Sequence, residues 1–224
     1  FSLDMAAMRH AIEGYQPAVI FLASPNNPTG STFQQSDIEE IMELAPGLVV
    51  VDEAYQPFVS PGRDDFMARI VDYPDLIVMR TLSKVGLAGI RLGLIAGHPD
   101  WMKELDKLRL PYNINSLTQV TASFAIDNWS VFRGQIEQIC RERDRVYKVL
   151  SSMQGIQAFP SDTNFILFRV SENRAEKIHA QLLHKGILIK CLHRPGSTLD
   201  NCLRVTIGRP DENDAFLSGL SELL

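Results

Sequence analysis

The residues best suited to chemistry stand just beyond three apolar runs of the chain. Residues 18–24, 48–51 and 76–80 are apolar runs of strand length. In an open parallel sheet, ligands bind beyond the carboxyl ends of the strands. The groups that follow these runs are an amide, a carboxylate, a phenol, two hydroxyls and an amine: Asn27, Asp52, Tyr55, Thr81, Ser83 and Lys84. Their positions predict that these side chains converge on one edge of one sheet.

Each of these residues also has an ordinary structural interpretation. Asn27 lies in SPNNPTG, where Pro28 and Gly30 are typical of a turn. Asp52 could cap a helix, Tyr55 could be an edge aromatic, and Lys84 could be a solvated loop lysine. Taken singly, these interpretations are the more common ones. The whole set, in order and at one predicted edge, is much harder to explain by packing and turns.

Pyridoxal phosphate chemistry needs this combination of groups. A lysine amine bonds the cofactor covalently, and a carboxylate beside the pyridine nitrogen keeps that nitrogen protonated, because a close opposite charge favours the charged form. An amide and a phenol suit the ring oxygen, while hydroxyls and an arginine suit the phosphate. Arg91 follows Lys84 by seven residues in SKVGLAGIRLG, where glycines let the backbone turn tightly.

These residues lie in motifs that resemble those of the fold-type I, pyridoxal-phosphate-dependent aminotransferases. The motifs are SPNNPTG, VVVDEAY, TLSKVGLAGIRLG, PYNIN, TNFILF and CLRVTIGRPDEN. NPTG together with SK…GLAG.R.G is highly specific for this superfamily. The resemblance runs from about residue 3 to the C-terminus, and it is greatest to the histidinol-phosphate aminotransferases.

The resemblance implies a role for each matching residue. Lys84 would bond the cofactor and move the proton of the substrate, and Asp52 would pair with the ring nitrogen. Tyr55 and Asn27 would bind the ring oxygen. The residues implied in phosphate and substrate binding are Thr81, Ser83 and Arg91 for the cofactor phosphate, Arg204 for the α-carboxylate, and Asn164 and Tyr112 near the substrate.

The substrate residues keep alternative interpretations. Arg204 could pair with a surface carboxylate, although its strand in a small domain favours a clamp that closes over the cofactor. Asn164 and Tyr112 could be plain strand and loop residues.

Two features depart from the family pattern. The spacing from Lys84 to Arg91 is one residue shorter than in many relatives. The chain also begins after the segment in which relatives carry a glycine-containing phosphate loop, a ring-stacking aromatic and a tyrosine that reaches the partner subunit. We therefore expect these 224 residues to be the C-terminal portion of a longer enzyme, weakly active or inactive alone.

The pattern around the motifs predicts an α/β fold with a mostly parallel sheet. Apolar runs without alternation, separated by helical segments, are typical of parallel strands covered on both faces. Helices are expected over 4–13 and 36–47, and strands over 18–24, 48–55, 76–84 and 92–97. Ser36 and Glu39 have the spacing of a capping box. Residues 1–140 are thus expected to be part of the large cofactor-binding domain.

Residues 141–224 are expected to form a small α+β domain. A helical pattern runs from about 116 to 153 and bridges the two domains. Beyond it, strands are expected over 163–170, 187–192 and 202–208, with helices over 174–186 and 211–224.

The composition of the chain argues against several classes of binding partner. The net charge of −5, without a basic block, argues against nucleic acid or an anionic membrane. No apolar run is long enough to cross a bilayer, and no secretory signal is recognisable. The three cysteines are widely spaced and the five histidines scattered, which favours reduced thiols in a cytoplasmic protein without a metal site.

We therefore expect a transaminase that converts histidinol phosphate and 2-oxoglutarate to imidazole-acetol phosphate and glutamate, with a homodimer implied by the resemblance. Two alternatives stay open. One is a related aminotransferase or decarboxylase acting on an aromatic or phosphorylated amino acid. The other is an aminotransferase-like ligand-sensing domain of a regulator.

Overall fold

The computed structural model describes residues 1–60, 62 and 65–224. These residues form two compact units, residues 1–26 with 32–134 and residues 27–31 with 135–224. The short segment 27–31 therefore packs with the C-terminal half of the chain. In the described part of the chain, no helix is both long enough and apolar enough to span a bilayer.

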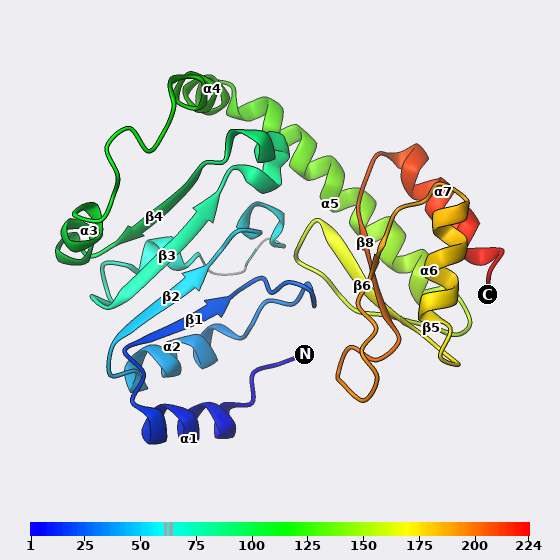
Figure 1. Cartoon of the computed structure of the whole chain (residues 1–224), viewed down its shortest axis with the longest axis horizontal. Coiled ribbons are helices and arrows are strands. Elements are labelled where there is room, and N and C mark those ends of the chain that lie inside the picture. Colours follow the sequence, from blue (N-terminus) through cyan, green and yellow to red (C-terminus); the bar gives the residue numbers. More distant parts are fainter. Residues whose placement is uncertain (61, 63–64) are drawn as a thin grey trace. The chain divides into compact units, whose positions relative to one another are not determined.

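The first unit is built on a mostly parallel sheet with the order β1-β2-β3-β4 (Figure 1). The strands are β1 (Val19–Ala23), β2 (Leu48–Asp52), β3 (Leu76–Thr81) and β4 (Gly93–Gly97). β1, β2 and β3 pair in parallel, and β4 pairs with β3 antiparallel. The parallel strands consequently end at one edge of the sheet, as their apolar sequences predict.

Helices α1 (Met5–Tyr15) and α2 (Gln35–Leu44) cover one face of this sheet. The first unit also contains α3 (Pro99–Asp106), α4 (Ser116–Asp127) and the start of α5 (Trp129–Ser152). Figure 1 shows α1 and α2 along the sheet, and their Ile12, Ile38 and Ile41 share a buried core with Leu22 and Val51. The opposite face is less covered, since the Phe21 side chain is 70% exposed.

Short single turns connect the strands of this unit. They are η1 (Gln56–Phe58), η2 (Phe66–Arg69), η3 (Ser83–Leu87) and η4 (Ala88–Ile90). η1 follows β2 and η3 follows β3, so the chain turns directly after each strand. The expected strands over 48–55 and 76–84 therefore end earlier, at Asp52 and Thr81.

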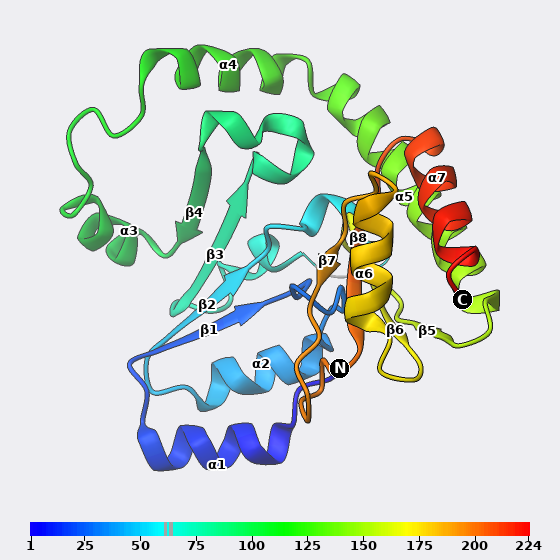
Figure 2. The ribbon, with the colours of Figure 1, turned by 45° about the vertical axis from the view of Figure 1, so that its right-hand side comes forward.

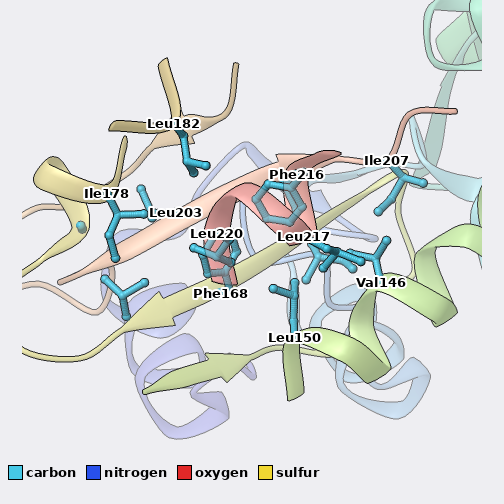
Figure 3. Close-up of a cluster of buried hydrophobic side chains, with 14 residues drawn as sticks. Val146, Leu150, Phe168, Ile178, Leu182, Leu203, Ile207, Phe216, Leu217 and Leu220 are labelled. Atoms are coloured by element: carbon cyan, nitrogen blue, oxygen red, sulfur yellow. The ribbon is translucent and has the colours of Figure 1, made fainter. Parts of the chain in front are cut away.

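The second unit contains an antiparallel sheet with the order β5-β6-β8-β7. Its elements are β5 (Ile156–Ala158), β6 (Phe165–Val170), α6 (Ala175–His184), β7 (Lys190–Cys191), β8 (Cys202–Thr206) and α7 (Pro210–Ser221). α6 and α7 lie close together (Figure 2). Figure 3 shows Phe168 of β6 and Phe216 of α7 within the same apolar cluster, with ring centroids 5.9 Å apart. Val146 and Leu150 of α5 complete this core.

Two local predictions are wrong. α2 begins at Gln35 after an N-cap residue, Gln34, that makes no side-chain cap hydrogen bond, so the capping box expected at Ser36 does not form. Because the helix starts earlier, Ser36 lies inside its first turn. Glu39 instead accepts hydrogen bonds from Gln35 Nε2 and Arg69 Nη2, each at 2.7 Å.

The strand expected over 187–192 shortens to β7, Lys190–Cys191. Ile187 and Ile189 pack against the apolar cluster of the second unit rather than continuing the ladder along β8. The hydrophobic run predicts too long a strand because core packing and strand pairing produce the same sequence pattern.

Candidate active site

Lys84 lies directly beyond β3, in the turn that starts at Ser83. Its Nζ is 5.2 Å from the centroid of the Tyr55 ring, and Tyr55 is buried just beyond β2. This is the geometry of a cation over an aromatic face. The structure therefore brings together an amine and a phenol that are 29 positions apart, as the parallel arrangement of β2 and β3 predicts.

Asp52 is the last residue of β2 and pairs in register with Ala23 and Met79. Its Oδ1 accepts a hydrogen bond from the Ala54 backbone N–H at 2.9 Å, which orients the half-buried carboxylate. A hollow of about 400 Å³ lies beside it, lined by Asp52, Ala54, Met79, Arg80, Thr81, Gly93, Leu94 and Ile95. The first unit thus presents a carboxylate and a hydroxyl to one open space.

Thr81 and Ser83 form a cluster of hydroxyls where β3 ends. Thr81 Oγ1 lies 2.9 Å from Ser83 Oγ and 3.1 Å from the Leu92 carbonyl oxygen. It also accepts a hydrogen bond from the Ser83 backbone N–H at 3.0 Å. These local contacts fix the turn that carries Lys84.

Arg91 ends the loop that begins at Lys84. The loop turns through Gly86 at φ +95°, and Arg91 itself has a left-handed φ of 54°. Its exposed guanidinium lies 3.4 Å from the Ala88 carbonyl oxygen. Ile90 is anchored to α4 by a hydrogen bond from Thr118 Oγ1 at 3.0 Å. Arg91 is therefore in the same loop as Lys84, with its side chain in solvent.

Tyr112 stands apart from these residues. It lies between α3 and α4, and its side chain is fully exposed. A role near a substrate is not visible in its contacts, so it stays a prediction.

The second unit positions Arg204 on β8. Its guanidinium carbon lies 4.7 Å from the centroid of the Phe165 ring, and its Nη1 donates to Asn27 Oδ1. Its Nε is buried and has no hydrogen-bond partner among the described residues. Because buried donors are nearly always paired, this N–H indicates a place for an acceptor.

Asn164 precedes β6, and its carbonyl oxygen accepts a hydrogen bond from the Ile207 backbone N–H at 2.9 Å. The structure thus places Asn27, Asn164 and Arg204 in the second unit, and Asp52, Tyr55, Thr81, Ser83, Lys84, Arg91 and Tyr112 in the first.

Lys190 was missed in the sequence. It pairs in register with Arg204, so the two residues are directly opposite on neighbouring antiparallel strands. Like charges placed this way repel each other, and an anion between them would relieve the repulsion. The available signal is a lysine in an apolar run, one strand before the strand that carries Arg204.

A second missed pair lies behind the strand ends of the first unit. Glu53 is buried and receives hydrogen bonds from Arg80. Burial raises the pKa of the Glu53 carboxyl above its usual value, and the contacts with Arg80 oppose that rise. The pair of Glu53 with Arg80 could not be predicted from VVVDEAY, because a sequence does not tell which of two neighbouring acidic residues points inward.

Comparisons with known proteins show which proteins this chain is similar to. A family model described as "Aminotransferase class I and II" matches residues 1–220. Histidinol-phosphate aminotransferase 2 of Nitrosococcus oceani is 51% identical over 220 residues, which are 98% of this chain and 60% of that protein. The chain thus spans about three fifths of this relative's length.

Solved structures share the fold. The histidinol-phosphate aminotransferase of Sinorhizobium meliloti, in complex with pyridoxal-5'-phosphate, matches with a TM-score of 0.87 and 25% identity, covering 98% of this chain and 61% of that one. A decarboxylase from Sulfurospirillum multivorans matches with a TM-score of 0.88 and 23% identity, covering 100% of this chain and 66% of that one. The second similarity concerns the fold alone.

Proposed function

The chain belongs to the class I and II aminotransferase family, and on that premise we propose that it carries the catalytic lysine of a histidinol-phosphate aminotransferase. The reaction would transfer the amino group of histidinol phosphate to 2-oxoglutarate, giving imidazole-acetol phosphate and glutamate. The observation that carries the proposal is the position of Lys84. Its Nζ lies over the Tyr55 ring, and Lys84 follows β3, which pairs with β2, the strand that ends in Asp52.

The residues of the first unit fit pyridoxal phosphate, so we assign this unit to part of the cofactor-binding domain and the second unit to the small domain. Lys84 would bond the cofactor, Asp52 would face its ring nitrogen and Tyr55 would donate to its ring oxygen. The hydroxyls of Thr81 and Ser83 cluster where a phosphate would be held, and Arg91 would add its charge. When bound, the cofactor supplies an electron sink for the carbanion that forms at the substrate α-carbon.

The protein groups would then bind and move protons. Lys84 Nζ would take the proton from the α-carbon of the amino donor. In the second half of the reaction it would give a proton to the α-carbon of the new amino acid, glutamate. The Asp52 carboxylate would keep the ring nitrogen protonated through its opposite charge. Asn27 would donate from its amide nitrogen, because its amide oxygen already accepts from Arg204.

Recognition of the substrate is assigned to the second unit. The Arg204 guanidinium, with its unpaired Nε, suits a carboxylate that needs two parallel donors. Lys190, opposite Arg204, supplies a further positive charge for an anionic substrate. Asn164 and Tyr112 are the remaining proposed substrate residues. One site serving two substrates in turn implies a ping-pong cycle.

A transamination assay of the full-length protein, with 2-oxoglutarate as acceptor, tests the substrate. We expect glutamate to form faster, by kcat/KM, from histidinol phosphate than from phenylalanine or tyrosine. A preference for either aromatic donor by more than about tenfold, roughly 1.4 kcal/mol in transition-state binding, would overturn the choice of substrate. Release of carbon dioxide from the donor would instead identify a decarboxylase.

The proposal includes a homodimer in the cytoplasm. Leu117, Val120 and Phe124 form an exposed apolar face on α4, with Phe124 65% exposed, and a partner subunit would cover such a face. Among the described residues, Cys140, Cys191 and Cys202 form no disulfide bond, as expected in a reducing compartment.

Sedimentation of the Phe124→Glu variant tests the dimer. We expect a shift to monomer, whereas Ser123→Glu on the same helix should leave the assembly unchanged. A dimer that persists in Phe124→Glu would contradict this interface.

A further inference from the structure

The ends of β2 and β3 are joined by an ion pair on the face of the sheet that does not carry Asp52. We propose that Glu53 and Arg80 are positioning residues, which hold Asp52 and Lys84 in the arrangement that captures pyridoxal phosphate. This inference rests on the proposed function. Neither residue is proposed to touch the cofactor.

The Glu53 carboxylate is fixed by three donors. Its Oε2 accepts from Arg80 Nε at 2.9 Å and from Arg80 Nη2 at 2.7 Å. Its Oε1 accepts from the Phe66 backbone N–H at 3.0 Å. The residue is 1% exposed. Two donors of one guanidinium meet on a single carboxylate oxygen, and a backbone N–H holds the other oxygen, which restricts both the distance and the angle between the two side chains.

The second partner of Arg80 is Asp65, whose Oδ1 accepts from Arg80 Nη2. Arg80 is thereby held between two carboxylates, and its guanidinium has little freedom to leave Glu53. The pair therefore has the geometry of a fixed link rather than of a fluctuating surface ion pair.

The location of the pair connects it to the proposed site. Glu53 directly follows Asp52, and Arg80 directly precedes Thr81. The register of β2 and β3 ends with Asp52 opposite Met79, and the Glu53 backbone N–H donates to the Met79 carbonyl at 2.9 Å. The side-chain pair thus joins the two strands at the point where the ladder ends and the turns to Tyr55 and Lys84 begin.

Alternation along the strands separates the pair from the site itself. Neighbouring residues of a strand point to opposite faces. The side chains of Asp52 and Thr81 are thus on one face and those of Glu53 and Arg80 are on the other, although Arg80 also contributes to the lining of the hollow beside Asp52. A displacement of Glu53 would rotate Asp52, because the two share one peptide unit.

Stability alone is a poor explanation for the pair. The desolvation free energy of two buried charged groups is often larger than the gain from their attraction. Apolar residues of similar size in the same place are commonly as stabilising as the ion pair. A defined orientation at the strand ends is what the ion pair supplies and apolar residues would not.

Spectrophotometric titration with pyridoxal phosphate tests the inference in Glu53→Gln and Arg80→Lys. Glu53→Gln keeps the size of the side chain but removes its charge, and Arg80→Lys keeps the charge but cannot place two donors on Glu53 Oε2. We expect the apparent Kd for the cofactor to rise by about tenfold or more, since small displacements of reacting groups have large effects. Glu39→Gln is the matched control, because Glu39 also pairs with an arginine, Arg69 at 2.7 Å, but lies on α2.

The outcomes separate this inference from the proposed function. Cofactor binding within twofold of the wild type in both variants would overturn it, and so would an equal loss in Glu39→Gln. If wild-type protein shows no Lys84-dependent binding, the proposed function fails instead.

Amide exchange of the cofactor-free protein then decides the positioning role. Faster exchange concentrated in residues 52–55 and 76–84, at the ends of β2 and β3, in Glu53→Gln and Arg80→Lys supports the inference, while unchanged or uniformly faster exchange overturns it. Melting curves of the same samples show whether each variant is folded, and a variant that does not fold is replaced by the other one.

Discussion

Arg204 donates a hydrogen bond to Asn27 although 177 positions separate the two residues. The contact lies within the second unit, which includes residues 27–31. A second link joins the same segment to this unit, because the Asp162 backbone N–H donates to the Gly30 carbonyl at 2.8 Å. The turn after β1 and the strand β8 are therefore held together as parts of one structure.

The first prediction concerns Arg204 as the carboxylate clamp. In cofactor-loaded Arg204→Lys, the Kd for glutarate, a dicarboxylate that cannot be transaminated, should rise by about tenfold or more, because lysine cannot form the bidentate contact. Calorimetric titration measures it. Arg209→Lys, an exposed arginine beyond β8, is the control and should bind glutarate normally. An unchanged Kd in Arg204→Lys would exclude the clamp.

Gly30 provides the second prediction. It has φ +77°, and a Cβ there would lie 2.5 Å from Ser161 Oγ. Gly30→Ala should therefore lower the free energy of unfolding by about 1–3 kcal/mol, from backbone strain and overpacking together. Denaturant unfolding measures this loss.

Gly196→Ala separates the two causes of that loss. Gly196 has a similar φ of +72°, but a Cβ there would meet no atom within 4 Å. It should be the milder substitution, and Ser161→Gly should recover part of the loss in Gly30→Ala. Equal losses at both glycines would mean that segment 27–31 is not packed against Ser161.

The strands and their polar ends could be predicted because buried parallel strands have continuous apolar sequences that stop abruptly. The position of Lys84 and Tyr55 at the same edge of the sheet could be predicted from that pattern alone. The contact between Arg204 and Asn27 could not be predicted from local patterns, since it depends on how distant segments pack. The capping box predicted at Ser36 does not form, because the spacing of Ser36 and Glu39 is also compatible with two residues inside the helix.

Glu142 provides a prediction about pH. Hydrogen bonds from Arg145 and Asn213 lower the pKa of its carboxyl below the usual value. A pKa lower in the folded than in the unfolded state adds stability above the unfolded pKa, and this is lost as the pH falls through the folded pKa. Glu142→Gln should therefore be less stable than wild type by about 1 kcal/mol near pH 7.

The difference should shrink as the pH falls below the ordinary carboxyl pKa and through the lowered pKa of folded Glu142, because the wild type then loses this charge. Unfolding curves between pH 3 and pH 7 measure it. Glu137→Gln, at an exposed position on the same helix, is the control and should unfold like the wild type at pH 7. A difference for Glu142→Gln that is constant across the range would contradict the role of its charge.

The most direct test of the account is the covalent capture of pyridoxal phosphate by Lys84. The cofactor is added to the protein, the adduct is reduced with borohydride, and the modified peptide is identified by mass spectrometry. Lys84→Arg is the control, since it keeps a positive charge near Tyr55 but has no primary amine. We predict a visible absorbance band and a modified Lys84 in the wild type, with neither in the variant. Modification of another lysine, or a band that persists in Lys84→Arg, would contradict the account.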